Sequence, residues 1–97
     1  MWCLADTLKA LGDESRLKIV KMLQEGKLPV GEIAQRCGLS QPTVSYHLKI
    51  LKQVGIAINN RDGKWIYYNL NPDIFVYLAL FMQYRKRRWF GIRCREQ

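Results

Sequence analysis

Between residues 40 and 49, a short run of polar side chains has the composition and spacing of a surface that reads duplex DNA. A helix over this stretch turns these side chains away from its apolar positions Val44, Leu48 and Leu51. Amides, hydroxyls and ammonium groups on such a face can hydrogen-bond base edges in the major groove and bind phosphates. The indicated chemistry is recognition, and the candidate residues on this helix are Ser40, Gln41, Thr43, Ser45, Tyr46 and Lys49.

Each residue type suggests a separate task on DNA. The Gln41 amide can pair with adenine in the major groove, and Thr43 or Tyr46 can contact a thymine methyl group or a phosphate. Lys49 is expected to bind phosphate, which sets affinity rather than sequence preference. His47 lies beside Leu48 at the edge of the buried face, and we expect it to pack or hydrogen-bond rather than bind a ligand.

A basic hairpin follows this helix. Residues 56–60 and 64–70 have the alternation and β-forming side chains of two strands, and Asp62-Gly63 is a strong turn signal between them. Arg61 and Lys64 flank that turn and can reach phosphate or the minor groove. An isolated amphipathic helix would favour an ordinary solvated face, but a turn, helix and hairpin in succession favour DNA recognition.

The elements that position these residues can be assigned from caps and glycines. A helix over 30–37 ends at Gly38, and Gly38-Leu39 is the tight turn of a helix-turn-helix. Ser40 caps the fourth helix, and Gly55 ends it.

The remaining elements complete one domain over residues 1–97. Helices are expected over 2–11, from Asp13 to the Gly26 stop, and over roughly 73–88, with 27–29 as a connector. In the second helix we expect Leu17, Ile19, Val20 and Leu23 to face inward, and Arg16, Lys18 and Lys21 to face solvent. The predicted fold is mainly α with a small β-hairpin, a winged helix-turn-helix in the order α-α-α-α-β-β-α.

Charge and composition narrow the partners. The formal net charge of +8 favours an anionic partner, and residues 85–95 carry Arg85, Lys86, Arg87, Arg88, Arg93 and Arg95. This basic tail is either a solvated helix end or a further phosphate contact. No secretory signal or membrane-length apolar run is present, so we expect a cytoplasmic protein without membrane insertion. With one histidine and no nucleophile or paired-carboxylate arrangement, no enzymatic activity is expected.

The last predicted helix is too apolar all round for a lone surface helix. A chain of this length has little core left to cover it, so pairing with a second copy explains it better than packing within one chain alone. The dimerisation helices would be about 2–11 and 73–90. Their candidate interface residues are Trp2, Leu4, Leu8, Phe75, Leu78 and Phe81.

Five segments, 8–19, 30–34, 39–51, 55–56 and 61–68, resemble the ArsR/SmtB group of small winged-helix repressors, in that group's order and spacing. The resemblance covers residues 8–70. It implies a homodimer paired through its first and last helices on double-stranded DNA with a palindromic operator. It also implies a repressor that a metal, metalloid or redox effector releases from that operator.

The sensing residues of that group are only partly present. Many arsenic- and cadmium-sensing relatives carry a Cys-x-Cys pair where this chain has Pro29 and Gly31, and the last helix lacks histidine. The remaining thiols are Cys3, Cys94 and Cys37. Cys3 of one chain could approach Cys94 of the other and bind a thiophilic metal or metalloid, or undergo redox chemistry. No such cofactor is required for folding.

Three other functions stay open at the level of sequence. The chain could be a regulator without an effector, in which case the three thiols have no sensing role. It could be a protein–protein interaction module on the same fold. It could also bind nucleic acid without sequence preference through the basic tail, Arg85 to Arg95.

Overall fold

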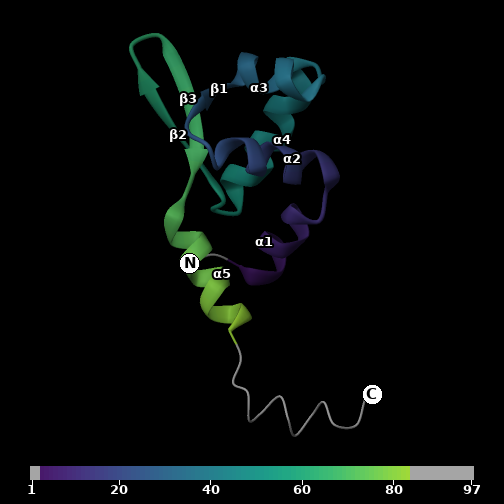
Figure 1. Ribbon diagram of the computed structural model, residues 1–97, viewed down its shortest axis with the longest axis vertical. Helices are drawn as coiled ribbons and strands as arrows, with labels where there is room; N and C mark the ends of the chain where they lie inside the picture. Colours follow the sequence, from purple (N-terminus) through teal and green to yellow (C-terminus); the bar gives the residue numbers. More distant parts are fainter. Residues whose placement is uncertain (1–2, 84–97) are drawn as a thin grey trace, which may run out of the picture.

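The computed structural model describes residues 3–83 of the 97-residue chain. It confirms the winged helix-turn-helix fold (Figure 1). The order within these residues is α1 (Leu4–Leu11), α2 (Glu14–Leu23), β1 (Leu28–Pro29), α3 (Val30–Cys37), α4 (Gln41–Gln53), β2 (Ala57–Asp62), β3 (Trp65–Leu70) and α5 (Pro72–Met82).

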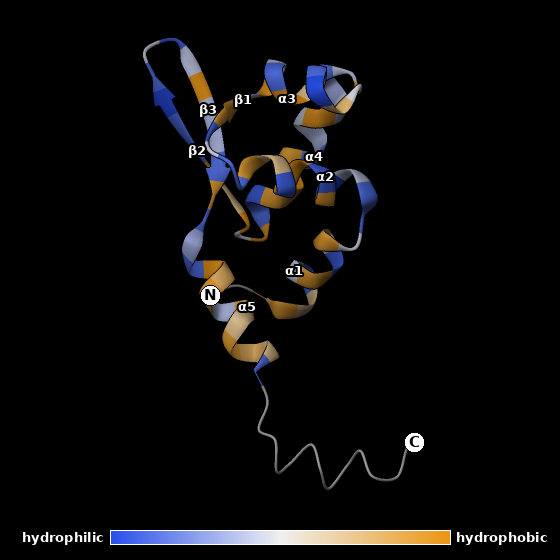
Figure 2. Ribbon diagram, viewed as in Figure 1, coloured by the Kyte–Doolittle hydropathy of each residue, from blue (hydrophilic) through white to orange (hydrophobic). Residues whose placement is uncertain are grey.

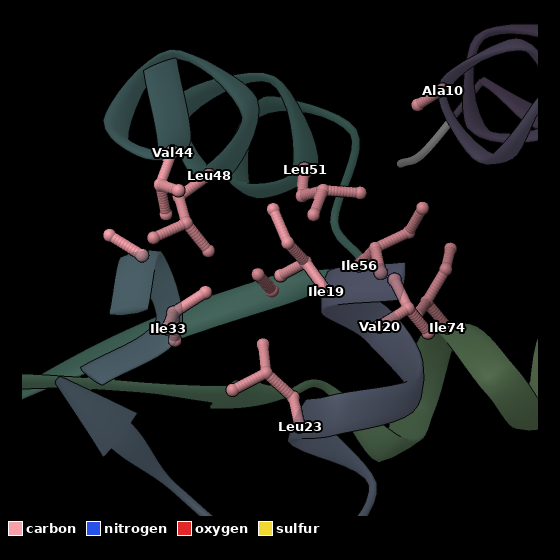
Figure 3. Packing of buried hydrophobic residues seen from close by; sticks show 12 residues of the cluster. Ala10, Ile19, Val20, Leu23, Ile33, Val44, Leu48, Leu51, Ile56 and Ile74 are labelled. Carbon is pink, nitrogen blue, oxygen red and sulfur yellow. The ribbon is translucent and has the colours of Figure 1, made fainter. Parts of the chain in front are cut away.

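The inner face of α4 is the centre of the hydrophobic core. Val44, Leu48 and Leu51 each have 0% of their surface exposed, as their i, i+4, i+7 spacing requires. Figure 3 shows these side chains pointing toward Ile19 of α2 and Ile33 of α3. Since helices α2, α3 and α4 share one core, the orientation of α4 is fixed by packing on its entire inner face.

Side-chain caps begin the helices where the sequence predicts them. The Asp13 carboxylate accepts a hydrogen bond from the Arg16 amide at 3.0 Å, at the start of α2. The Ser40 hydroxyl accepts from the Thr43 amide at 3.3 Å, at the start of α4. Both caps satisfy backbone N–H groups that have no partner within their helix.

The sheet contains one strand more than the sequence predicts. Its order is β1-β3-β2 and both pairings are antiparallel, with Leu28 opposite Tyr68 and Pro29 opposite Tyr67. The expected connector at 27–29 is therefore wrong in its last two residues. Two residues are too few to show a period, and this strand exists because the edge of β3 is available to pair with.

The wing is the hairpin of β2 and β3, and it turns one residue later than Asp62-Gly63 suggests. Asp62 pairs with Trp65, so the loop residues are Gly63 and Lys64. Gly63 has φ +65°, and a glycine with positive φ at the first loop position is typical of a type II′ turn. The strands thus span 57–62 and 65–70 instead of 56–60 and 64–70.

One face of α2 differs from the prediction. Leu17 is 45% exposed, whereas Arg16, expected in solvent, is half-buried. The buried residues Ile19, Val20 and Leu23 lie three, four and seven positions after Arg16, so helical spacing places position 16 on the inner face and Leu17 beside it. Arg16 is accommodated there because its Nε donates to the Ala10 carbonyl at 2.7 Å.

The last helix, α5, ends at Met82, earlier than the expected 88–90. Gln83 is extended, with φ −74° and ψ 131°. The basic tail lies outside the described residues.

We expect Gly38→Ala to destabilise the fold, because Gly38 ends α3 in the left-handed region with φ +71°. A side chain in that conformation costs about 1–2 kcal/mol. Urea unfolding monitored by circular dichroism measures the loss. The control is Gly12→Ala, which makes the same chemical change at φ −80°. Equal effects of the two substitutions would contradict the assignment of Gly38 as a conformational requirement.

Candidate nucleic-acid interface

The outer face of α4 carries the candidate recognition residues in full exposure. Because Val44 and Leu48 are completely buried, the intervening positions must face solvent. Tyr46 is 59% exposed. The other candidate side chains on this helix are also exposed: Gln41, Thr43, Ser45 and Lys49.

The first turn of α4 is already ordered by its own side chains. Besides its cap to the Thr43 amide, the Ser40 hydroxyl lies 2.8 Å from the Thr43 hydroxyl. Ser40 therefore positions the helix start, and Thr43 is held in one orientation toward solvent. A partner that meets this turn finds the polar groups ordered in advance, which lowers the entropic cost of binding.

The Gln41 side chain lies over the first turn of α3. A Cβ atom built on Gly31 would approach Gln41 Nε2 to 3.4 Å. The small residue at position 31 leaves room for the amide at the corner of the helix-turn-helix. This close approach brings together a residue of α3 and a candidate base-reading residue of α4.

Two lysines, one on the wing and one just before β1, lie against aromatic rings of β3. Arg61 and Lys64 are exposed, and Lys64 Nζ lies 5.9 Å from the centre of the Trp65 ring. Lys27 Nζ lies 4.8 Å from the centre of the Tyr67 ring. Such contacts restrict the ammonium groups on the hairpin. In Figure 1 the wing tip and α3 lie at the same end of the molecule, away from α5.

Two residues of this surface are absent from the sequence-based candidates. Trp65 is 56% exposed beside the turn, and a large aromatic at that place was detectable from its position next to Lys64. Lys27 had no such signal, because its contact with Tyr67 depends on the pairing of β1 with β3.

The candidate dimer residues differ in exposure. Leu8 is 38% and Phe81 55% exposed, Leu4 and Phe75 are half-buried, and Leu78 is 8% exposed and so belongs mainly to its own chain. Trp2 lies outside the described residues. The apolar face of α5, which is orange in Figure 2, also exposes Val76, Leu80 and Met82.

Within residues 3–83, no helix combines the length and the apolar character needed to cross a membrane.

The described thiols do not form a metal site. Cys3 is exposed just before α1, and Cys37 is partly buried in the last turn of α3. Across residues 3–83, no group of three or more His, Cys, Asp or Glu residues could hold a metal ion. Cys94 lies outside the described residues, so the pairing of Cys3 with Cys94 stays a prediction.

Burial changes the chemistry of Cys37. Desolvation raises the pKa of this thiol, and the charge of Lys18 only partly opposes the shift. Since the thiolate is the reactive form, Cys37 is expected to be a poor ligand and a slow nucleophile near neutral pH.

Comparison with known proteins identifies a family. Its model, described as "Bacterial regulatory protein, arsR family", matches residues 13–59. The transcriptional repressor SdpR of Bacillus subtilis (strain 168) is 39% identical over 69 residues, 71% of this chain and 77% of that protein. The arsenical resistance operon repressor of Escherichia coli (strain K12) is 40% identical over 72 residues, 73% of this chain but only 62% of its own length.

Solved structures agree with this assignment. The homodimeric winged helix-turn-helix DNA-binding domain of a possible ArsR-family regulator from Mycobacterium bovis superposes with a TM-score of 0.72 at 33% identity, covering 80% of this chain and 73% of that one. The transcriptional repressor BigR from Xylella fastidiosa has a TM-score of 0.64 at 34% identity, covering 84% and 88%.

The two described thiols should differ in alkylation. Iodoacetamide at pH 7.5, followed by peptide mass spectrometry, should label exposed Cys3 well before Cys37. The rate at Cys37 should keep rising with pH, because its raised pKa keeps it protonated at neutral pH. Rapid labelling of Cys37 at pH 7.5 in the folded protein would contradict its assignment as a partly buried thiol with a raised pKa.

Proposed function

The chain belongs to the arsR family of bacterial regulatory proteins, and on this premise we propose that it is a sequence-specific repressor that binds its operator as a homodimer. Members of this family are transcriptional regulators with a DNA-binding winged helix-turn-helix and are not enzymes. The proposal extends this family assignment to the mode of binding, the assembly and the control of this chain. It places the protein in the cytoplasm, with the DNA.

One observation carries the DNA-binding proposal. The inner face of α4 is fully buried at Val44, Leu48 and Leu51, and its outer face is polar, exposed and without acidic residues. The cationic wing follows it directly in the chain. A helix of this kind fits the major groove, while the wing tip reaches the neighbouring backbone or minor groove.

The homodimer accounts for the apolar side chains of α5. Val76, Leu80, Phe81 and Met82 are each at least 55% exposed, and neighbouring apolar residues left in water are costly. The Mycobacterium bovis relative is described as homodimeric, which supports the same assembly here. In this proposal, α1 and α5 form the interface and each chain supplies one copy of α4.

A symmetric dimer explains how repression would work. Two copies of α4 would enter successive major grooves about one helical turn, ~34 Å, apart on a palindromic operator. Occupation of that site would exclude the transcription machinery. An effector would release the DNA only to the extent that it binds the free dimer geometry more tightly than the DNA-bound one.

The effector is the least constrained part of the proposal. Several relatives are named for arsenic or cadmium resistance, which supports a metal, metalloid or redox signal. Because residues 3–83 of one chain contain no metal-binding cluster, a thiol site would have to combine exposed Cys3 with Cys94, within or across the dimer. Cys37 is the weakest of the three candidates because burial keeps it protonated.

Selection of genomic fragments by the full-length protein at physiological salt tests the DNA-binding proposal. We expect a palindromic site to be enriched. On that site Lys49→Ala should weaken binding and lower the slope of log affinity against log salt by about 0.9 per chain, the value for one phosphate contact. The control is Lys52→Ala, which removes a lysine three residues further along α4.

Gln41→Ala should instead change which base is preferred at one position of each half-site. If no site is enriched, the specific-repressor proposal is wrong. If affinity falls to background when Arg85, Lys86, Arg87 and Arg88 are all changed to Gln in the full chain, binding is driven by the tail. Repeating the gel shift with As(III), Zn(II) and an oxidant identifies the class of effector.

Phe81→Glu should weaken the homodimer, because it buries a charge in the proposed interface. Sedimentation velocity at several concentrations measures the shift toward monomer. Leu17→Glu is the matched control, since Leu17 is an exposed apolar residue at 45%, but on α2. Dissociation by Leu17→Glu with no effect of Phe81→Glu would move the interface to α2 and contradict the proposed assembly.

A further inference from the structure

Arg16 connects three helices with one side chain. Its Nε donates to the carbonyl of Ala10 in the last turn of α1, at 2.7 Å. Its Nη1 donates to Nδ1 of His47 on α4, at 3.2 Å. Its backbone amide completes the Asp13 cap of α2. The side chain is half-buried, so these contacts are shielded from water better than those of a surface arginine.

The contact with His47 restricts the protonation of the imidazole. A guanidinium group can only donate hydrogen bonds and remains charged at all ordinary pH values. Nδ1 must therefore accept, which requires the neutral ring with its proton on Nε2. An imidazolium has no free lone pair at Nδ1 and would place a second positive charge beside Arg16.

A second contact joins α1 to the end of α4. The fully buried Thr7 hydroxyl shares its single hydrogen between two carbonyls, that of Cys3 at the start of α1, at 3.0 Å, and that of Val54 just after α4, at 3.2 Å. Thr7 and Arg16 therefore bind α4 at two points, near its end and near its middle. Because α1 is part of the proposed dimer interface, these contacts relate the recognition helix to the second chain.

We propose that Arg16 and His47 form a latch that sets the orientation of α4 relative to α1, and that the latch holds only while His47 is neutral. This inference rests on the proposed function, since the orientation of α4 determines how two copies fit successive major grooves. It makes Arg16 and His47 positioning residues that act through α4, and acidification the signal that loosens the dimer on its operator.

The charged groups around the latch are nearly balanced. Asp13 lies near His47 and Arg16, and the hydrogen bond from the Arg16 amide holds the pKa of this carboxyl below its ordinary value, against desolvation and with the help of the Arg16 charge. Asp6 and Lys9 of α1 line, with Arg16, a hollow of about 330 Å³ between α1 and α4.

The hollow provides space for the Arg16 side chain after its contact with His47 is lost. It is lined by Ile50 and Gln53 of α4 and by Asp6 of α1, whose carboxylate is the acidic group of the lining. On protonation of His47, the guanidinium would lose its acceptor on α4 and turn toward α1. The tie to the Ala10 carbonyl can persist, so the change is confined to the contact between α1 and α4.

The chain contains one histidine, which makes the test specific. Operator affinity of the full-length protein is measured by fluorescence anisotropy from pH 8 to pH 5.5, for wild type and for His47→Gln. The Gln amide oxygen can accept from Arg16 and does not titrate. Relative to His47→Gln, wild type should lose about tenfold in operator affinity at pH 5.5, because protonation of His47 removes the acceptor for Arg16. A tenfold loss corresponds to about 1.4 kcal/mol of binding free energy.

Two further variants separate positioning from folding. His47→Leu removes the acceptor and should lower affinity at pH 8 to the level of wild type at pH 5.5, with its helical circular dichroism retained. Arg16→Lys, which cannot reach both acceptors with a fixed fork, should behave similarly. A purely structural role would shift the unfolding midpoint of these variants and leave the pH profile of operator affinity parallel to that of wild type.

The latch can fail separately from the proposed function. If wild type binds an operator at pH 8 and its pH profile matches that of His47→Gln, the latch is wrong and the repressor stands. If no operator is found, ¹⁵N NMR of the single imidazole still decides: a neutral ring protonated at Nε2 at pH 8 supports the latch. A ring protonated at Nδ1 overturns it.

Discussion

The burial of one face of α4 is the constraint on which the rest of the structure depends. Val44, Leu48 and Leu51 are completely enclosed, and loss of any one of them leaves a cavity that costs about 2–5 kcal/mol for a leucine. Because the inner face is fixed by α2 and α3, the outer face has a fixed direction as well. The candidate recognition residues are therefore oriented by apolar packing, and none of them contributes to the core.

The polar contacts of α1 add a second layer to this arrangement. Thr7 and Arg16 do not build the core, yet they relate α4 to the helix that is proposed to meet a second chain. The core fixes α4 against α2 and α3, so in the proposed latch the contacts at its edge act on how this unit meets α1. In the proposed latch, DNA binding is controlled through the contacts of Arg16 with α1 and α4. This control needs no metal, and residues 3–83 contain no group of three or more ligands that could hold one.

Much of the fold is predictable because local chemistry and packing agree. Asp13 and Ser40 cap the helices where expected, Gly38 ends α3, and the i, i+4, i+7 pattern of α4 identifies its buried face. The candidate DNA-reading residues on α4 follow from that pattern alone, and all of them are exposed. Their contacts with DNA stay predictions.

The rest depends on contacts between segments distant in the sequence. The strand β1 and the position of Lys27 exist only because β3 offers an edge, and the inward turn of Arg16 depends on a carbonyl of another helix. The last helix also divides its apolar residues between two purposes: Ile74 and Leu78 pack in the chain, while Leu80 and Phe81 remain exposed. Hydropathy alone cannot separate these groups, because all four residues are apolar.

A hydroxyl-radical footprint of the full-length protein on its selected operator tests the central claim most directly, since the claim concerns where two copies of α4 lie on DNA. The account predicts two equivalent protected regions related by the symmetry of the site, with centres about one helical turn, ~34 Å, apart. A single protected region, or protection spread evenly along any DNA offered, would contradict it.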